Sequence, residues 1–205
     1  MCFSATASFT ASAVLGFVGA ATLIKTQNKK AWLLAAVPML FSLQQFVEGL
    51  LWLSLQSRPE YTLPLTYIFL FFALLLWPIY VPVMAMIMEP HKIRRRILFG
   101  FCIIGAVIGI LFYASFFIKP EAARVVNQCL YYPNPAPYPT LLSYLYILIT
   151  VGSGIVSSRP ILKLFCVLLL ISSLVTWLVY TVNFISVWCF FAAIISGILY
   201  FQPQK

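Results

Sequence analysis

Acidic residues are almost absent from this chain of 205 residues, which contains no aspartate and four glutamates. Histidine is scarcer still, since His91 is the single one. The His-rich zinc sites of hydrolases, including the membrane ceramidase type, therefore lack their ligands. Ser153 has no histidine or aspartate within an apolar segment as its base, which argues against a serine protease of the rhomboid type. The last apolar segment has no lysine, which excludes a retinal Schiff base in the usual rhodopsin position.

Apolar residues, by contrast, make up 63% of the sequence, and the mean hydropathy is +1.01. A soluble domain of this size cannot bury so much apolar surface. Helices are expected rather than barrel strands, because the apolar segments lack strict two-residue alternation and because backbone groups in lipid must be bonded within each segment. Crossing a hydrocarbon core takes roughly 20 helical residues. The sequence predicts an all-α, polytopic membrane protein, with residues 1–205 as a single domain of seven transmembrane helices: Ser8–Ile24, Ala31–Leu55, Leu63–Met88, Ile97–Ile118, Pro139–Ser157, Ile161–Tyr180 and Val182–Phe201.

Positive charge is distributed unevenly between the connections. By the positive-inside rule this predicts an N-terminus outside and a cytoplasmic C-terminus, in the plasma membrane, which is the inner membrane of a bacterium. The net charge of +9 is then a topology signal, with membrane lipid and not nucleic acid as the partner, and His91–Arg96 also suits anionic headgroups. The expected cytoplasmic set is Lys25, Lys29, Lys30, Lys92, Arg94, Arg95, Arg96, Arg159, Lys163 and Lys205, and the outer set is Arg58, Lys119 and Arg124.

One segment combines a carboxylate and two amides inside a predicted membrane helix: FSLQQFVEGLLW, residues 41–52. Gln44, Glu48 and Trp52 follow one another at four-residue steps, with Gln45 beside them, so one helix face carries the polar group. With a rise of about 1.5 Å per residue, Glu48 is expected on the order of 10 Å below the outer end of its helix. An acid at this depth is expected to face the bundle interior.

Two interpretations of Glu48 stay open. A functional carboxylate binds a cation, a metal or a polar ligand, or relays a proton, because an intramembrane acid is costly unless it is paired. A structural one is protonated and hydrogen-bonded to Gln44, Gln45 or a serine, so that it ties helices together.

The five cysteines fall into three groups. Cys102 and Cys166 are expected as ordinary small apolar residues in the cytoplasmic halves of their helices. Cys189 is expected in the last helix at roughly the depth of Glu48. Cys2 and Cys129 are expected on the outer face, where they form a disulfide or share a metal as thiolates. Removal of Met1 would give Cys2 a free amine beside its thiol, a pair that chelates copper or zinc or acts as a nucleophile with its own base.

Aromatic residues flank the same outer region. Ser186 opens the segment SVWC. Trp188 and Trp177 are either interfacial anchors or, together with Trp52 and Tyr180, the walls of an aromatic pocket around Glu48. The connection Lys119–Tyr138, with its proline-rich second half, is either a lid or an irregular loop at headgroup level.

The positions of proline and glycine predict two further features of the helices. Pro78 and Pro82 predict a kink in the third helix, because each lacks a backbone donor. Gly105 and Gly109 have the GxxxG spacing, which is expected to pack a neighbouring helix within the subunit more than to form a dimer.

The chain resembles a bacterial family of small multi-pass membrane proteins of unknown function in three motifs: MCFSATASF at the start, QQFVEGLLW and SVWCFFAA. The resemblance spans nearly the whole chain and brings no established activity. It implies that the residues matching the motifs are the ones of interest: Cys2, Ser4, Gln45, Glu48, Trp52, Ser186, Trp188 and Cys189.

The leading functional hypothesis is a sensor or binding protein with an outward-facing polar site that holds a metal ion, copper or zinc, or a small ligand. Its metal ligands are predicted as Cys2, Glu48 and Cys189, and its ligand-binding residues as Gln44, Gln45, Glu48, Trp52, Ser186 and Trp188. A second hypothesis is a small-solute or ion transporter, because helices 5 to 7 repeat the orientation of helices 1 to 3 around a linking fourth helix. A third is a membrane enzyme with Cys2 or Cys189 as its nucleophile.

Overall fold

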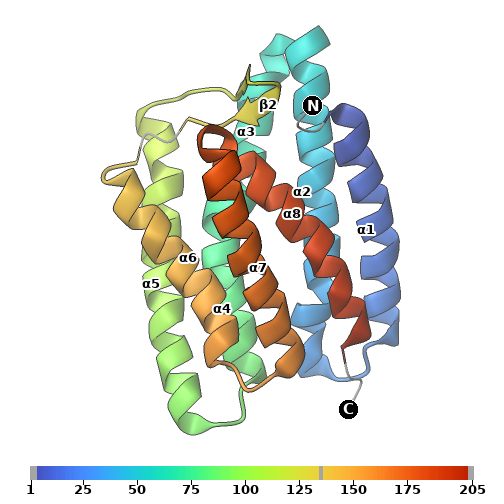
Figure 1. Cartoon of the computed structure of the whole chain (residues 1–205), viewed down its shortest axis with the longest axis vertical. Coiled ribbons are helices and arrows are strands. Elements are labelled where there is room, and N and C mark those ends of the chain that lie inside the picture. Colours follow the sequence, from blue (N-terminus) through green and yellow to red (C-terminus); the bar gives the residue numbers. More distant parts are fainter. Residues whose placement is uncertain (1–3, 134–135, 203–205) are drawn as a thin grey trace.

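A computed structural model describes residues 4–133 and 136–202, and Cys2 therefore lies outside the described residues. Helices dominate this part of the chain, and a short two-stranded hairpin is inserted before α6 (Figure 1). The main elements are α1 (Ala5–Lys25), α2 (Trp32–Ser57), α3 (Thr62–Leu70), a π-helical segment (Phe71–Leu76), α4 (Trp77–Met88), α5 (Lys92–Ile118), β1 (Arg124–Val126), β2 (Cys129–Tyr131), α6 (Pro139–Val156), α7 (Pro160–Val179) and α8 (Phe184–Ser196). Short 3₁₀ turns cover Lys29–Ala31, Pro59–Tyr61, Thr181–Asn183 and Gly197–Phe201.

Among the described residues, seven helical stretches are long and apolar enough to cross a membrane, which confirms the all-α, seven-span prediction. The third stretch combines α3, the π-helical segment and α4, and the seventh combines α8 with its flanking 3₁₀ turns. The boundaries agree to within a few residues except at α5, which begins at Lys92 instead of Ile97. His91 is the N-cap of this helix, so the basic run after it forms the first helical turn.

Helix α1 packs along α2 through small residues. The Ser42 hydroxyl donates to the Ser12 carbonyl at 2.7 Å. A Cβ atom on Gly19 would lie 2.7 Å from the Met39 backbone nitrogen, and one on Gly49 would lie 2.6 Å from the Phe9 ring. These contacts run in opposite directions along the two helices, which are therefore antiparallel and in backbone contact.

Proline determines the backbone path of the third span. The Trp77 N–H donates to the Phe72 carbonyl, one residue beyond the α-helical register. Pro78 has no N–H for the Ala73 carbonyl, which accepts instead from the Tyr146 hydroxyl of α6 at 2.6 Å. The distortion expected from the prolines thus includes a π-helical segment, and it creates a cross-helix hydrogen bond.

The glycines of α5 pack inside the subunit, as predicted. Pro82 has no N–H to donate to the Pro78 carbonyl, and Gly105 lies against that carbonyl so closely that an added Cβ atom would be 1.9 Å from its oxygen. Gly109 is packed less tightly, since a Cβ atom added to it would lie 3.2 Å from the carbonyl oxygens of Leu74 and Leu75.

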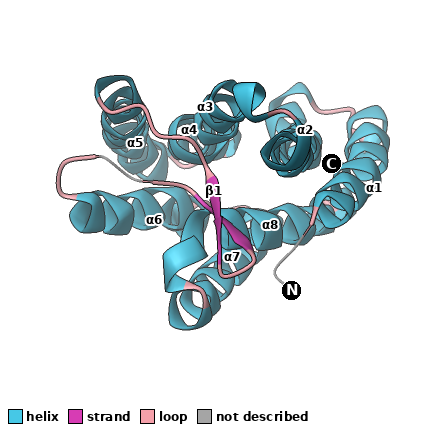
Figure 2. Cartoon of the chain, turned by 90° about the horizontal axis from the view of Figure 1, so that it is seen from above, coloured by secondary structure: helices cyan, strands magenta, loops and turns pink. Residues whose placement is uncertain are grey.

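The hairpin closes one end of the bundle, which we call the hairpin end (Figure 2). β1 and β2 pair antiparallel, and Asn127 and Gln128 join them with φ of 53° and 60°. Positive φ at both central residues is the geometry of a two-residue hairpin turn, which asparagine tolerates well. The Asn183 amide donates to the carbonyls of Val126 and Leu130, both at 3.1 Å. The connection is therefore an ordered cap and not only a surface loop.

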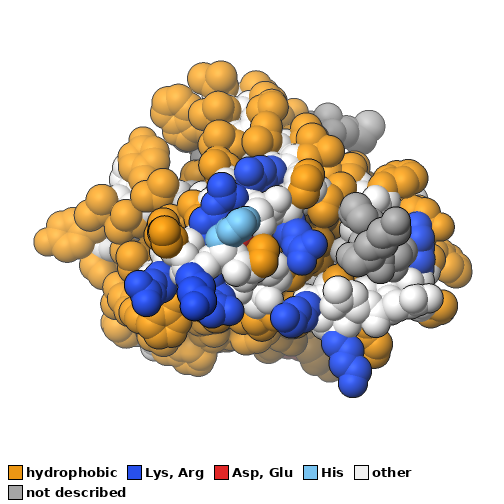
Figure 3. Space-filling model, turned by 90° about the horizontal axis from the view of Figure 1, so that it is seen from below, with side chains coloured by type: hydrophobic (Ala, Val, Ile, Leu, Met, Phe, Trp, Pro, Cys, Tyr) orange, Lys and Arg blue, Asp and Glu red, His pale blue; other side chains and the backbone are white. Residues whose placement is uncertain are grey.

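The opposite end, which we call the basic end, carries most of the positive charge (Figure 3). Its buried acid is Glu89, in the turn between α4 and α5. The Glu89 carboxylate accepts from the backbone N–H of Ser158 at 2.6 Å and of His91 at 3.2 Å. Burial alone would raise the pKa of Glu89, but these donors outweigh it and the pKa is lowered. Glu89 thereby joins the α4–α5 turn to the α6–α7 turn.

Candidate functional site

Glu48 lies inside the bundle between α2 and α8, with 2% of its surface exposed. The Ser186 hydroxyl donates to one carboxylate oxygen at 2.5 Å, and the Gln45 amide donates to the other at 3.1 Å. α8 reaches α2 because the 3₁₀ turn Thr181–Asn183 directs the chain back beneath the hairpin. The segments QQFVEGLLW and SVWC, which the sequence placed at a similar depth, are thus in direct contact.

Gln44, one turn before Glu48, is held by the third span. Its side-chain oxygen accepts from the Trp77 indole N–H at 2.8 Å. The Trp77 ring also stacks on Phe41 of α2, with centroids 4.1 Å apart. The indole therefore fixes the orientation of the Gln44 amide, which lies beside the Cys189 thiol and whose nitrogen makes no hydrogen bond of ordinary geometry among the described residues.

Tyr132 and Cys189 complete the group around the carboxylate. Tyr132 follows β2 and stacks on Phe69 of α3, with centroids 4.5 Å apart and an interplanar angle of 4°. Burial, and then the nearby Glu48 charge, raises the pKa of Tyr132 well above its ordinary value, so the phenol keeps its proton. The Cys189 thiol lies beside the Gln44 amide and within electrostatic range of Glu48.

Unsatisfied polar atoms are concentrated around Glu48. Within residues 4–133 and 136–202, four buried side-chain atoms lack a hydrogen-bond partner: Ser8 Oγ, Gln44 Nε2, Gln45 Oε1 and the Tyr132 hydroxyl. Three of them belong to the Glu48 group described above. Ser8 is one turn from Ser12, on the buried face of α1, and the antiparallel packing places it level with the same turn of α2. Buried polar groups are normally hydrogen-bonded, so this concentration points to a place where a ligand or water completes the network.

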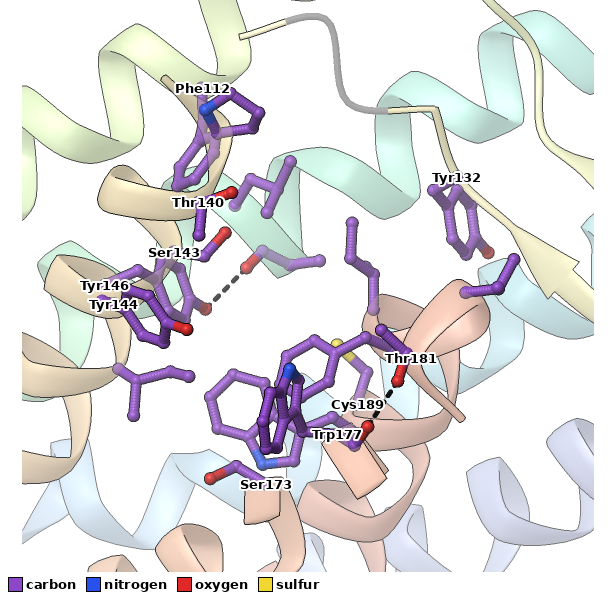
Figure 4. Close-up of a pocket in the computed structure, with 18 of the residues that line it drawn as sticks. Phe112, Tyr132, Thr140, Ser143, Tyr144, Tyr146, Ser173, Trp177, Thr181 and Cys189 are labelled. Carbon is purple, nitrogen blue, oxygen red and sulfur yellow. Dashed lines mark hydrogen bonds between the residues drawn. The ribbon is translucent and has the colours of Figure 1, made fainter. Parts of the chain in front are cut away.

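A cavity of about 520 Å³ adjoins this group (Figure 4). It lies beneath the hairpin, among α6, α7, α8 and the π-helical segment, and Tyr132 and Cys189 form part of its wall. These two residues therefore lie between the cavity and the Glu48 carboxylate. They belong both to the polar group and to the cavity wall. The aromatic lining residues are Phe112, Tyr131, Tyr132, Tyr144, Tyr146, Trp177, Phe184 and Trp188.

The predicted site residues separate into four groups in the structure. Gln44, Gln45, Glu48, Ser186 and Cys189 come together. Trp188 lines the cavity and donates its indole N–H to the Leu169 carbonyl at 3.2 Å, and Trp177 is a half-exposed wall of the same cavity. Trp52 is buried but does not line the cavity. Cys129 is buried in β2, at the hairpin end, and its disulfide with Cys2 stays a prediction because Cys2 is outside the described residues.

Two residues of the site, Tyr132 and Trp77, were not predicted from the sequence. Tyr132 belongs to a connection that looked irregular, and only its hairpin geometry directs the ring inward. Trp77 was not singled out, although an indole in mid-helix needs a hydrogen-bond acceptor. That need was an available signal, and Gln44 is the acceptor.

Metal ligands do not cluster in the part of the chain that the structure describes. No group of three or more His, Cys, Asp or Glu side chains occurs there. Glu48 and Cys189 are neighbours, but Ser186 and Gln45 already bond both carboxylate oxygens. The described residues therefore offer two of the three predicted metal ligands.

Comparison with known proteins places the chain in a family. A family model described as "Family of unknown function (DUF6629)" matches residues 1–205. The chain belongs to this family. No curated protein and no solved structure matches the chain. The family model covers the whole sequence. Because the function of the family is unknown, membership assigns no activity to the site.

Proposed function

We propose that the protein is a membrane-embedded binding protein whose small organic ligand occupies the aromatic cavity and contacts the Glu48 group through Tyr132 and Cys189. The supporting observation is that Tyr132, whose buried hydroxyl has no hydrogen-bond partner among the described residues, is part of both the cavity wall and the polar group around Glu48. Cavities of about 300–1,000 Å³ with aromatic walls and a few convergent polar groups are typical of small-molecule sites. In this proposal the Glu48 carboxyl group accepts hydrogen bonds from Ser186 and Gln45 and lies behind Tyr132 and Cys189, the two residues that contact the ligand.

The site faces outward in the proposed topology. Of the described basic residues, nine lie at the basic end and Arg58, Lys119 and Arg124 at the hairpin end, and the positive-inside rule then puts the hairpin outside. The protein is placed in the plasma membrane, the inner membrane of a bacterium, with a cytoplasmic C-terminus. A C-terminal green fluorescent protein fusion should then fluoresce, and a C-terminal alkaline phosphatase fusion should be inactive. The reverse pair of results contradicts this orientation.

Binding is tested by what the purified protein retains. Native mass spectrometry of the wild type in mild detergent should show a bound organic molecule, and solvent extraction should release it. Ser143→Phe, which fills the cavity from α6, should lose the molecule. Leu141→Phe, on the exposed face of the same helix, is the matched control and should keep it. A wild type that retains nothing, or equal retention in both variants, contradicts the proposal.

A metal ion is the second candidate, because Glu48 and Cys189 are buried neighbours and Cys2 is the third proposed ligand. Elemental analysis of purified wild type should then find copper or zinc, and Glu48→Gln or Cys2→Ser should abolish it. Unchanged metal in both variants, or none in the wild type, removes this candidate. Transport and thiol catalysis stay hypotheses for which the described residues supply no specific contact.

A further inference from the structure

We infer that the ligand of this cavity is a membrane-soluble amphiphile with a flat ring bearing a carbonyl oxygen, the chemistry of a lipid-soluble quinone, and that it enters sideways between α6 and α7. The inference rests on the proposed binding function and adds the chemical class and the route of the ligand. Three independent features of the cavity support it: its opening, its walls and its buried donor.

The opening faces the side of the bundle. Tyr144 of α6 and Leu174 and Trp177 of α7 line the cavity, yet 60%, 53% and 53% of their surfaces are exposed. The exposed faces of these helices are apolar, as expected for contact with lipid. The hairpin covers part of the end of the cavity with Tyr131 and Tyr132. A molecule already dissolved in the bilayer reaches the cavity between the two helices without leaving lipid.

The walls favour a flat, uncharged ring. Among the residues that the structure describes, no Lys, Arg, Asp or Glu lines the cavity, so a charged headgroup would find no ionic partner there. Trp188 contacts Tyr146 and Phe184, with ring centroids 6.0 Å and 5.4 Å apart, and these rings form one continuous aromatic surface. Aromatic surfaces of this kind bind flat rings in offset-stacked or edge-to-face geometry. The Tyr146 hydroxyl is occupied by the Ala73 carbonyl, which holds that wall in place (Figure 4).

The buried donor favours a carbonyl acceptor. The Tyr132 hydroxyl lies in the cavity wall, is buried, and has no hydrogen-bond partner among the described residues. It keeps its proton and lies within interaction range of Glu48, but no hydrogen bond of ordinary length and angle joins the two groups. An acceptor that arrives from the cavity can therefore take the phenolic O–H. A ring carbonyl meets this need, whereas a hydrocarbon chain alone leaves the donor unsatisfied.

Tryptophan fluorescence in lipid nanodiscs tests the inference, with decylubiquinone as the probe. Trp177 and Trp188 line the cavity, and quenching by bound probe should saturate. Trp177→Phe should reduce the saturable amplitude, whereas Trp32→Phe, at the basic end, should leave it unchanged. Ser143→Phe should remove the saturable phase, and Leu141→Phe should keep it. Quenching that rises linearly with probe and is equal in all variants reports only probe dissolved in the bilayer and overturns the inference.

The carbonyl contact has its own test. Tyr132→Phe keeps the stacking on Phe69 but removes the donor, so it should weaken decylubiquinone binding by about threefold to tenfold. Unchanged affinity shows that the phenol does not bind the ring carbonyl. If the protein retains a water-soluble molecule in a Ser143-dependent way but does not bind decylubiquinone, the binding function stands and the quinone class falls. If it retains nothing and does not bind the probe, both fall.

Discussion

Ser186 and Glu48 are 138 residues apart in sequence, and their side chains form a 2.5 Å hydrogen bond inside the bundle. The bond joins α8 to α2 within a cluster of buried polar groups beside an aromatic cavity. Because the carboxylate is buried, each of its donors affects the stability of the bundle as well as the proposed ligand contacts.

Ser186→Ala should lower the free energy of unfolding by about 1–3 kcal/mol, because it leaves a buried carboxylate with one donor fewer. Thermal unfolding of the purified protein in detergent measures the change. Ser196→Ala is the matched control on α8, since the Ser196 hydroxyl donates only to its own helix, at the Ala193 carbonyl. An equal effect of the two substitutions would show that the bond to Glu48 adds no stability.

Gly105→Ala should destabilise the protein by about 1–3 kcal/mol, because the new Cβ atom would lie 1.9 Å from the Pro78 carbonyl oxygen and force α4 and α5 apart. Gly100→Ala, one turn earlier in α5, is the control. It has no atom within 4 Å of the new Cβ and should be neutral or stabilising by up to about 1 kcal/mol. Thermal unfolding of both variants decides the point, and a neutral Gly105→Ala argues against this close approach.

Asn183→Leu should release the hairpin from α8, because it removes both hydrogen bonds to the hairpin backbone. Limited trypsin digestion should then cut faster after Arg124, in β1, than in the wild type. Thr181→Ala, in the same 3₁₀ turn, is the control, because the Thr181 hydroxyl donates to the Trp177 carbonyl of α7 and not to the hairpin. Equal cleavage of Asn183→Leu and wild type indicates that other contacts hold the hairpin.

Glu89→Gln should lower the free energy of unfolding by about 1–3 kcal/mol near neutral pH, because the buried carboxylate accepts two backbone N–H groups and an amide has a single oxygen for them. The folded-state pKa of Glu89 is lowered, so its stabilisation is full above the ordinary pKa of 4.5 and is lost as pH falls through the folded value. The difference between wild type and variant should therefore shrink on acidification. Unfolding measured from pH 7 to pH 3 checks this, and a constant difference contradicts it.

The positions of the spans followed from the sequence because a membrane helix is a local property. Length and hydropathy alone distinguish such a segment, and Glu48 was identified as an intramembrane acid for the same reason. The meeting of Glu48 with Ser186 was expected only as a shared depth, since helix rise fixes depth along an axis but not the angular position of one helix relative to another. The α5 boundary was misplaced because the basic run from Lys92 was interpreted as a loop, whereas a helix tolerates it in its first turn.

Four features followed from local sequence patterns: the apolar spans, the polar face Gln44–Glu48, the packing role of glycine in α5 and the uneven distribution of positive charge. The inward turn of Tyr132 from the hairpin, the bond between Trp77 and Gln44, and the cavity beside the acid depend on the packing of several segments. The two sets differ in the range of the interactions that produce them. Hydropathy and helical periodicity act within one segment, whereas a cavity and a buried hydrogen bond depend on how several segments pack against one another.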